Sequence, residues 1–363
     1  MKYSKKQLKG LPTPNEYVVK DIYNYIRIMK CFNMESKYLC RGEPDNYYEI
    51  TASGLRENIP FIKMQNDFKR EIFHKLSIDE RNNFLAFSQH HGIPTNLVDF
   101  TTFPLVALFF ACQSVSKKDK LDNDFGFVYL IKDELIDITD IITLNNDDNL
   151  FNLLLVNENV LVKLYDKLML FKQANDKKFY YYFKTLNEEW HYYFGETPFK
   201  RHLKVSFPKY NEGLYEFNID FKFIENNKRL FTLLESKYGK LNLCVAEYLL
   251  MIRDFLTKVI ENKEVVHWVN FLPNFVYKPL LTFERAINQR GVFVYQPYFS
   301  FTEEVYNFRV LMQQRIWPDI VVVIKNKNEI LKDLDFIGIN DKFIYSDFDH
   351  IAKYIKQSNL GSI

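Results

Sequence analysis

The sequence predicts an α+β fold in which a mixed central sheet is interrupted by a large helical insertion. Three observations support this prediction. A strand, a buried helix and a second strand follow one another between 37 and 131, strand patterns return after 279, and the residues between carry long helical periodicities. We therefore divide the chain at 1–139, 140–267 and 268–363, with the two outer parts forming one core.

The first part of the chain is predicted to contain helices around a short strand. Apolar residues recur at helical spacing in 14–32 and in 58–82, and the second pattern continues into a further helix at 83–90. Between the first two helices, 37–42 has the pattern of a strand that ends in a turn.

A buried helix and a core strand are expected next. Pro104 suits the first turn of a helix, and 105–111 is apolar on all sides, which indicates burial. A polar loop at 114–124 leads to 125–131, which has the composition of a core strand.

The insertion has mainly helical patterns, whereas the last part of the chain has both strand and helix patterns. Long helical patterns at 149–171 and 241–262 are separated by a polar interruption near 196–212. In the last part we expect strands at 279–283, 291–295 and 320–324, and helices at 327–334 and 348–357.

Composition narrows the class of protein. The chain of 363 residues has a formal charge of +2, so it carries no general attraction for nucleic acid. Its four cysteines form no CxxC pair, which disfavours a zinc site and favours a reducing cytosol. The apolar run 105–112 is too short to span a bilayer, and 1–20 lacks the apolar core of a signal peptide. We expect a cytoplasmic protein with no metal and no membrane partner.

The most informative stretch is QHHGIPTNLVDFTTFP, which runs from Gln89 to Pro104 between two apolar segments. Polar and turn-forming residues displayed between buried elements are typical of binding and catalytic sites. His90 and His91 could act as general acid or base, because imidazole titrates near neutrality. Adjacent side chains on an extended segment point in opposite directions, so we expect one histidine to hold the turn after it and the other to face a cleft.

Other candidate residues allow two interpretations each. Arg41, followed by Gly42 at a strand end, could present its planar fork to a phosphate or ribose, or could be a surface arginine before a turn. Asp99 and Thr101 would share one side of a strand, where they could hold a ligand hydroxyl or satisfy a buried strand end. The polar residues from Glu284 to Arg290 precede a core strand and could form a site or a solvated turn.

These pieces resemble the FRG domain family, which is named for an (F/Y)RG triplet. The triplet is Cys40-Arg41-Gly42 here, and the family block QHxGxPTRLLDWTxNPLxALxFA is matched from Gln89 to Ala111. Asn96 and Phe100 depart from the usual arginine and tryptophan, and Val98 and Phe103 are further departures. Further matches are Arg56 after the first motif, Arg285, Gln289, Gly291 and Phe293 in an RxxxQxGxF pattern, and the closing segments 338–340 and 347–349.

The order of an RG strand, a strand ending in threonine, an apolar helix and a GxVY strand is also similar to the NAD-binding core of ADP-ribosyltransferases. This similarity implies a related fold with NAD as co-substrate. It places Arg41 on the NAD phosphates or ribose, Thr101 beside the nicotinamide ribose, and Glu284 or Gln289 at the catalytic position. Together with the residues and motifs above, this gives Arg41, His90, His91, Thr101, Glu284 and Gln289 as candidate catalytic residues. The candidate cofactor-binding residues are Arg41, Gly42, Arg56, Asp99, Thr101 and Arg285.

We therefore expect a bacterial ADP-ribosyltransferase or NAD-hydrolysing effector, acting as a toxin or in phage defence on a protein or nucleic-acid acceptor. The alternative is a non-catalytic module that binds a nucleotide, a nucleic acid or a protein. A third interpretation is hydrolase chemistry on the histidines. Two basic clusters with interleaved phenylalanines could contact nucleic acid or be solvated faces: Phe199, Lys200, Arg201, His202 and Lys204, and Phe221, Lys222, Phe223, Lys228 and Arg229.

Overall fold

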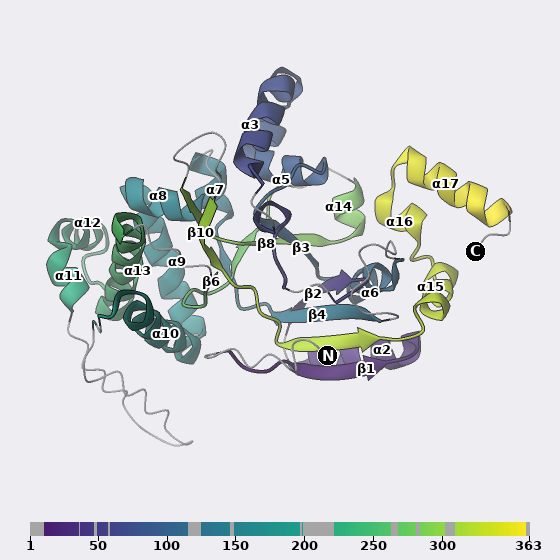
Figure 1. The fold of residues 1–363 in the computed structure, drawn as a ribbon, viewed down its shortest axis with the longest axis horizontal. Coiled ribbons are helices and arrows are strands. Elements are labelled where there is room, and N and C mark those ends of the chain that lie inside the picture. The colour runs from purple at the N-terminus through teal and green to yellow at the C-terminus, as the bar shows by residue number, and fades with distance from the viewer. Residues whose placement is uncertain are drawn as a thin grey trace.

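Strands from both ends of the chain form one mixed sheet in the computed structural model (Figure 1). The structure describes residues 11–35, 37–46, 49–56, 59–114, 125–145, 149–196, 198, 221–262, 268–280, 284–301 and 309–360. Within these residues the strand order of the larger sheet is β1-β11-β4-β2-β3-β8-β7-β5. The outermost pairs, β1 with β11 and β5 with β7, are parallel, and the pairs between them are antiparallel.

The strands of this sheet are β1 (Asn15–Val19), β2 (Tyr38–Glu43), β3 (Leu97–Thr101), β4 (Gly126–Lys132), β5 (Ile136–Asp137), β7 (Phe275–Tyr277), β8 (Gly291–Tyr295) and β11 (Ile320–Ile324). A smaller sheet contains β6 (Trp268–Val269), β10 (Arg309–Gln314) and β9 (Tyr298–Phe301) in that order. The strands expected at 125–131, 291–295 and 320–324 are thus confirmed as β4, β8 and β11.

Two buried glutamines join the two sheets. The Gln296 side chain accepts a hydrogen bond from the Ala52 amide (2.9 Å) and donates one to the Gln314 carbonyl (2.8 Å). Gln314 in turn donates from Nε2 to the Leu272 carbonyl (2.9 Å). These amides satisfy backbone groups that the ladders leave unpaired, which is the usual requirement for polar groups in a core.

Helix α6 (Pro104–Cys112) packs directly on the backbone of β2 and β4. The helix is apolar and buried, as its sequence predicts. A Cβ atom on Gly42 would lie 1.8 Å from the Ala107 carbonyl oxygen, and one on Gly126 would lie 1.9 Å from that of Ala111. The close approach therefore requires glycine at both positions. Helices α2 (Ile22–Glu35) and α15 (Lys327–Phe336) extend this layer.

The other face of β4, β2 and β3 is covered by the segments around α3 (Phe61–Ile72), which share a second apolar core with those strands. Short helices α4 (Ile78–Asn82) and α5 (Phe84–His90) lead from α3 to β3, and the short 3-10 helices η1 (Ser53–Leu55) and η2 (Phe73–Lys75) lie before and after α3. Helix α14 (Glu284–Asn288) packs against β8 and α16 (Asp341–Tyr345), and α17 (Phe348–Asn359) follows α16 as the last helix of the described residues.

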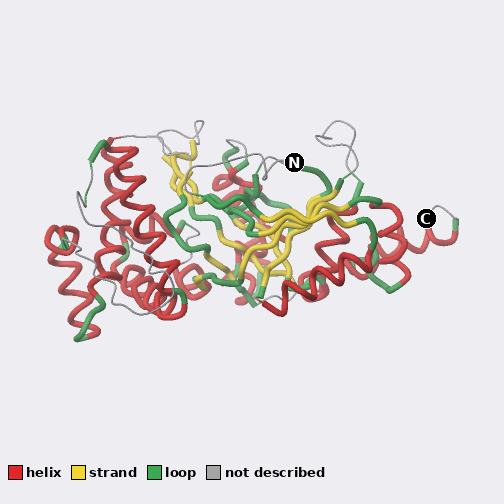
Figure 2. Tube along the Cα trace, turned by 90° about the horizontal axis from the view of Figure 1, so that it is seen from below, coloured by secondary structure: helices red, strands yellow, loops and turns green. Residues whose placement is uncertain are grey.

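A group of helices lies to one side of the sheet, at the left of Figures 1 and 2. It packs its core against residues of β3, β5, β7 and β8. Helical structure predicted within 140–267 is confirmed in the described part, whereas the division of the chain at 139 and 267 stays a prediction. The helices are α7 (Thr139–Asn145), α8 (Leu150–Val156), α9 (Glu158–Ala174), α10 (Asp176–Phe194), α11 (Lys222–Asn226), α12 (Lys228–Tyr238) and α13 (Leu243–Asn262).

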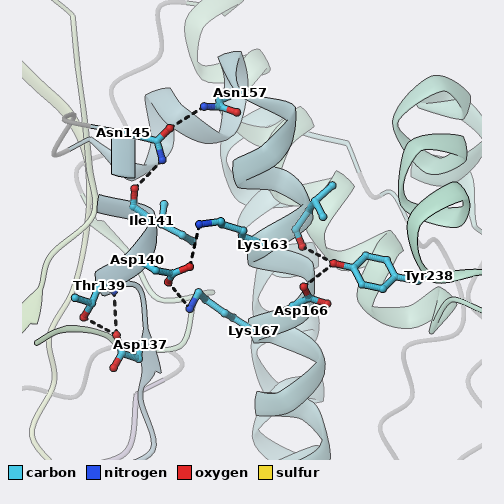
Figure 3. A network of polar contacts seen from close by, with 11 residues as sticks. Asp137, Thr139, Asp140, Ile141, Asn145, Asn157, Lys163, Asp166, Lys167 and Tyr238 are labelled. Atoms are coloured by element: carbon cyan, nitrogen blue, oxygen red, sulfur yellow. Dashed lines mark hydrogen bonds and ion pairs between the residues drawn. The ribbon is translucent and has the colours of Figure 1, made fainter. Parts of the chain in front are cut away.

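Polar contacts hold helices α7 and α12 of this group to α9 (Figure 3). Asp140, three residues after β5, accepts ion pairs from Lys163 (3.1 Å) and Lys167 (2.6 Å) on α9. Between these two lysines on α9, Asp166 accepts a hydrogen bond from the Tyr238 hydroxyl (2.5 Å) on α12. The ion pairs are partly exposed, so they orient α9 more than they stabilise it.

Two sequence predictions are wrong in detail. The helix expected over 14–32 begins only at Ile22, because 15–19 pairs with β11 as strand β1. Asp21 marks the true start, since its side chain accepts from the Asn24 amide (2.8 Å). The strand expected from 279 lies earlier, at β7. Pro279 lacks the amide hydrogen that a ladder needs, and 281–283 are outside the described residues.

Candidate active site

A cavity of about 250 Å³ opens where β2 and β3 separate. These two strands pair through Cys40 and Thr101 alone, whereas β2 pairs with β4 through six residues and β3 with β8 through five. Helices α5, α6 and α14 supply the other walls. The polar residues that line the cavity are Arg41, Gln89, His90, Asp99, Thr101, Arg285 and Gln289.

The volume limits what the cavity can enclose. Sites for small molecules usually measure roughly 300 to 1,000 Å³. At about 250 Å³ the cavity lies just below this range, so it can enclose only a small ligand or one part of a larger one.

The end of α5 brings Gln89 and His90 to the cavity. Gly92 adopts a left-handed conformation with φ of 79°, and its amide donates to the Gln89 carbonyl (3.2 Å). The Ile93 amide donates to the Ser88 carbonyl (3.0 Å). These paired bonds are those of a Schellman motif, which ends a helix at a glycine. The histidines thus lie at the end of a helix, and the extended segment expected for them is wrong.

A chain of hydrogen bonds fixes the orientation of Gln89. The buried Thr95 hydroxyl accepts from the Leu97 amide (3.1 Å) and donates to Gln89 Oε1 (2.6 Å). Gln89 Nε2 then donates to Asp99 Oδ2 (2.8 Å). A carboxylate can only accept, so each donor in the chain meets an acceptor. Sequence reasoning did not name Gln89 as a site residue, although it begins the informative block.

Arg41 spans the gap between β2 and β3. Its Nε atom lies 2.8 Å from the Glu43 carboxylate, and its Nη1 atom donates to the Asp99 carbonyl (2.8 Å). Burial acts to lower the pKa of Arg41, but the charges of Glu43 and Asp99 more than offset it and raise the pKa. Arg41 therefore stays charged and replaces part of the missing strand ladder.

The two histidines differ in position. His90 is half-buried and lines the cavity. Burial, followed by the charges of His91 and Arg285, lowers the pKa of His90, so its imidazole is mainly neutral at pH 7. His91 is exposed and outside the cavity lining, and its ring packs 4.4 Å from that of Phe87. Only His90 is placed to contact a ligand in the cavity.

Thr101 and Gln289 hold the cavity wall together. The Thr101 hydroxyl donates to the Gln289 carbonyl (2.6 Å) and accepts from the Phe103 amide (2.8 Å). The Gln289 side chain donates to the Ile344 carbonyl (3.1 Å) on α16. Thr101 thus satisfies a strand end, one of the two roles that its sequence position allowed.

The structure brings together most of the predicted site residues, namely Arg41, Gly42, His90, Asp99, Thr101, Arg285 and Gln289. It does not place His91 or Arg56 in the lining. The exposed Arg56 side chain instead donates to the Thr51 carbonyl (3.0 Å). The Glu284 side chain lies outside the described part of the chain, although its backbone begins α14. The catalytic and cofactor-binding roles of these residues stay predictions.

The basic clusters give less support to a nucleic-acid site. Lys200, Arg201, His202, Lys204 and Phe199 lie outside the described residues. In the second cluster, Phe223 is buried and Arg229 lies 2.7 Å from the Glu158 carboxylate. A buried ring is not available for stacking on a base.

Comparison with known proteins identifies a family for the segment that forms one side of the cavity. The family model of the FRG domain matches residues 36–120, which include β2, α5, β3 and α6. The chain contains an FRG domain. The matched part ends before Arg285 and Gln289, so the FRG domain supplies the strand side of the cavity and α14 comes from outside it. No curated protein and no solved structure matches this chain.

Asn96, which stands where the FRG family usually has arginine, does not line the cavity. Asn96 is buried, and its Nδ2 atom donates to the Gln296 carbonyl (3.2 Å). Within the described residues, no three His, Cys, Asp or Glu side chains gather in a way that could hold a metal ion. Nor does any helix of the described part have the length and apolar character needed to cross a bilayer.

Proposed function

We propose that the FRG domain and α14 bind part of an NAD-like dinucleotide, and that the protein breaks the bond between nicotinamide and ribose. The observation that carries this proposal is the convergence of a neutral histidine, an exposed carboxylate and two arginines on one cavity. These side chains match the chemical requirements of breaking a glycosidic bond. The resemblance to an ADP-ribosyltransferase core and a role as toxin or phage-defence effector belong to the same proposal.

Asp99 is suited to stabilise the reacting sugar. When the glycosidic bond breaks, its electron pair leaves with the nicotinamide nitrogen and positive charge develops on the ribose. A nearby carboxylate stabilises that charge directly. Asp99 is exposed to the cavity and fixed by Gln89. Glu284 is the second candidate for this role, since it lies one residue before Arg285.

His90 is suited to accept a proton. A water molecule or an acceptor hydroxyl that attacks the anomeric carbon must lose a proton, and a neutral imidazole can take it. The lowered pKa of His90 keeps the imidazole in that form at neutral pH. The products are then nicotinamide and either free ADP-ribose or an ADP-ribosylated acceptor.

The test is nicotinamide release from NAD by the purified protein, measured beside Asp99→Asn and Glu284→Gln. Release by the wild type that one of these variants lowers by about 100-fold or more would identify the stabilising carboxylate. Release that both variants retain would contradict the assignment of either group.

A wild-type protein that neither releases nicotinamide nor binds NAD by calorimetry would overturn the proposal. It would favour the alternative of a non-catalytic binding module. One observation already favours that alternative, because the Thr101 hydroxyl and the Gln289 amide are used within the protein.

A further inference from the structure

The two arginines in the cavity use their charges differently. Arg41 is paired with the Glu43 carboxylate, and both side chains are largely buried, 15% and 4% exposed. The Arg285 guanidinium makes no hydrogen bond or ion pair with any described residue, and lies 5.1 Å over the Tyr345 ring. An arginine stacked on an aromatic ring keeps its N–H groups available in the plane of the guanidinium. Arg285 is therefore the cation that can receive an anionic ligand.

Helix α16 holds Arg285 in position through Tyr345. Asn288 donates to the Phe343 carbonyl (3.0 Å), which fastens α14 to α16 beside the stacked pair. The Tyr345 ring also stacks on His350 of α17, with ring centres 4.2 Å apart. A side chain fixed before binding loses less conformational entropy when the ligand arrives. Tyr345 is thus a positioning residue for Arg285.

Asp99 adds a second requirement for the ligand. The Oδ2 atom of Asp99 accepts a hydrogen bond from Gln89 Nε2. The Oδ1 atom of Asp99 makes no hydrogen bond with the described residues. This oxygen can accept from ligand hydroxyl groups. A ligand that satisfies both Arg285 and Asp99 must carry an anion and hydroxyls within a cavity of about 250 Å³.

We propose that the cavity holds a ribose phosphate, with the phosphate on Arg285 and the ribose hydroxyls on Asp99. The proposal rests on the proposed function, since it names the part of NAD that is enclosed. It assigns the anion contact to Arg285 rather than to Arg41. Neither the nicotinamide ring nor adenine carries both required groups, so the rings would lie at or beyond the mouth of the cavity.

The test compares nicotinamide mononucleotide with nicotinamide riboside, which differ by the phosphate alone. By calorimetry, the wild type should bind the phosphorylated ligand roughly 10- to 100-fold more tightly, the range for hydrogen bonds to charged groups. Arg285→Gln should lose most of this preference. Asp99→Asn should weaken both ligands alike, because both carry the ribose. Inorganic phosphate as a third probe should bind more weakly than the mononucleotide.

Arg290→Gln is the matched control. Arg290 also stacks on an aromatic ring, 5.1 Å from Phe103, but it does not line the cavity. This variant removes the same charge five residues along the chain, just beyond the end of α14, and should keep the preference. If Arg285→Gln keeps it, or Arg290→Gln loses it equally, the proposal is wrong.

Tyr345 supplies a second test that does not depend on removing charge. Tyr345→Phe keeps the stacking ring and should keep the preference for the phosphate, whereas Tyr345→Leu should reduce it. Equal behaviour of the two variants would contradict the positioning role.

These outcomes separate the two proposals. Phosphate preference that depends on Arg285, without nicotinamide release, would preserve the anion contact and exclude the reaction. Nicotinamide release without any phosphate preference would preserve the reaction and exclude this contact.

Discussion

At the scale of single residues, the side chains that line the cavity are of two kinds: some bond within the protein, and others keep bonding capacity toward the cavity. Thr101, Gln289 and Arg41 each bond to neighbouring backbone or carboxylate groups. Asp99 and Arg285 retain bonding capacity toward the cavity. The family motifs contain both kinds of residue. A motif alone therefore does not show whether a side chain bonds within the protein or faces the cavity.

The charge of Arg285 should be visible in the pH dependence of the proposed cleavage of NAD. His90 must be neutral to accept a proton, so the rate should fall as pH drops through its pKa. Arg285 contributes to lowering that pKa. In Arg285→Gln the pKa should rise, and the acidic limb of the kcat profile should move to higher pH. A profile that stays in place would show that His90 does not control the acidic limb.

At the scale of elements, contact between α6 and the strands beneath it depends on two glycines. Arg41 and Gly42 make different contacts from β2. The Arg41 side chain reaches β3, and the lack of a side chain at Gly42 allows α6 to pack closely on the strand. The glycine of the family triplet is therefore explained by packing. The same close approach lets α6 form a wall of the cavity.

Gly42→Ala should destabilise the protein by about 3 kcal/mol or more, at the upper end for overpacking a core. The added methyl group would meet the helix backbone, which cannot turn aside as a side chain can. Gly291→Ala is the control, because its Cβ would lie 3.8 Å from its nearest neighbour, the Ala286 carbonyl oxygen. Urea denaturation of the two variants should differ by most of this amount, and equal midpoints would refute the packing argument.

At the scale of the whole molecule, the helical group is joined to the smaller sheet through a half-buried acid. Glu189 on α10 accepts from the Asn270 amide (3.1 Å). Burial raises the pKa of Glu189 to about 8, with the Asn270 hydrogen bond and the charge of Arg315 opposing the change. The carboxyl group is thus mostly protonated in the folded protein at pH 7.

This raised pKa predicts a loss of stability on the alkaline side. Between pH 4.5 and about 8 the folded state holds the proton more tightly than the unfolded state, so the free energy of unfolding falls as pH rises. The slope from this group is at most about 1.4 kcal/mol per pH unit. Glu189→Gln should flatten the decline in urea titrations at pH 5, 6.5 and 8. An unchanged slope would mean that Glu189 ionises normally.

Sequence patterns predicted the elements that are apolar over a long run and missed those defined by distant partners. Helix α6 and strands β4, β8 and β11 are continuous apolar segments, so local composition was sufficient. Strand β1 was mistaken for helix because its identity depends on pairing with β11, about 300 residues later. Tyr345 was missed for the same reason, since only the folded chain shows that it lies under Arg285.

The single residue pair between β2 and β3 makes ligand binding a matter of stability as well as recognition. Arg41 on one strand and Asp99 on the other both line the cavity. A molecule held between them would add contacts across the weakest junction of the larger sheet. Occupancy should then raise the melting temperature and slow amide hydrogen exchange in both strands, in proportion to the logarithm of ligand concentration above Kd. Binding in this cavity would therefore be measurable as a stabilisation of the junction between the two halves of the sheet.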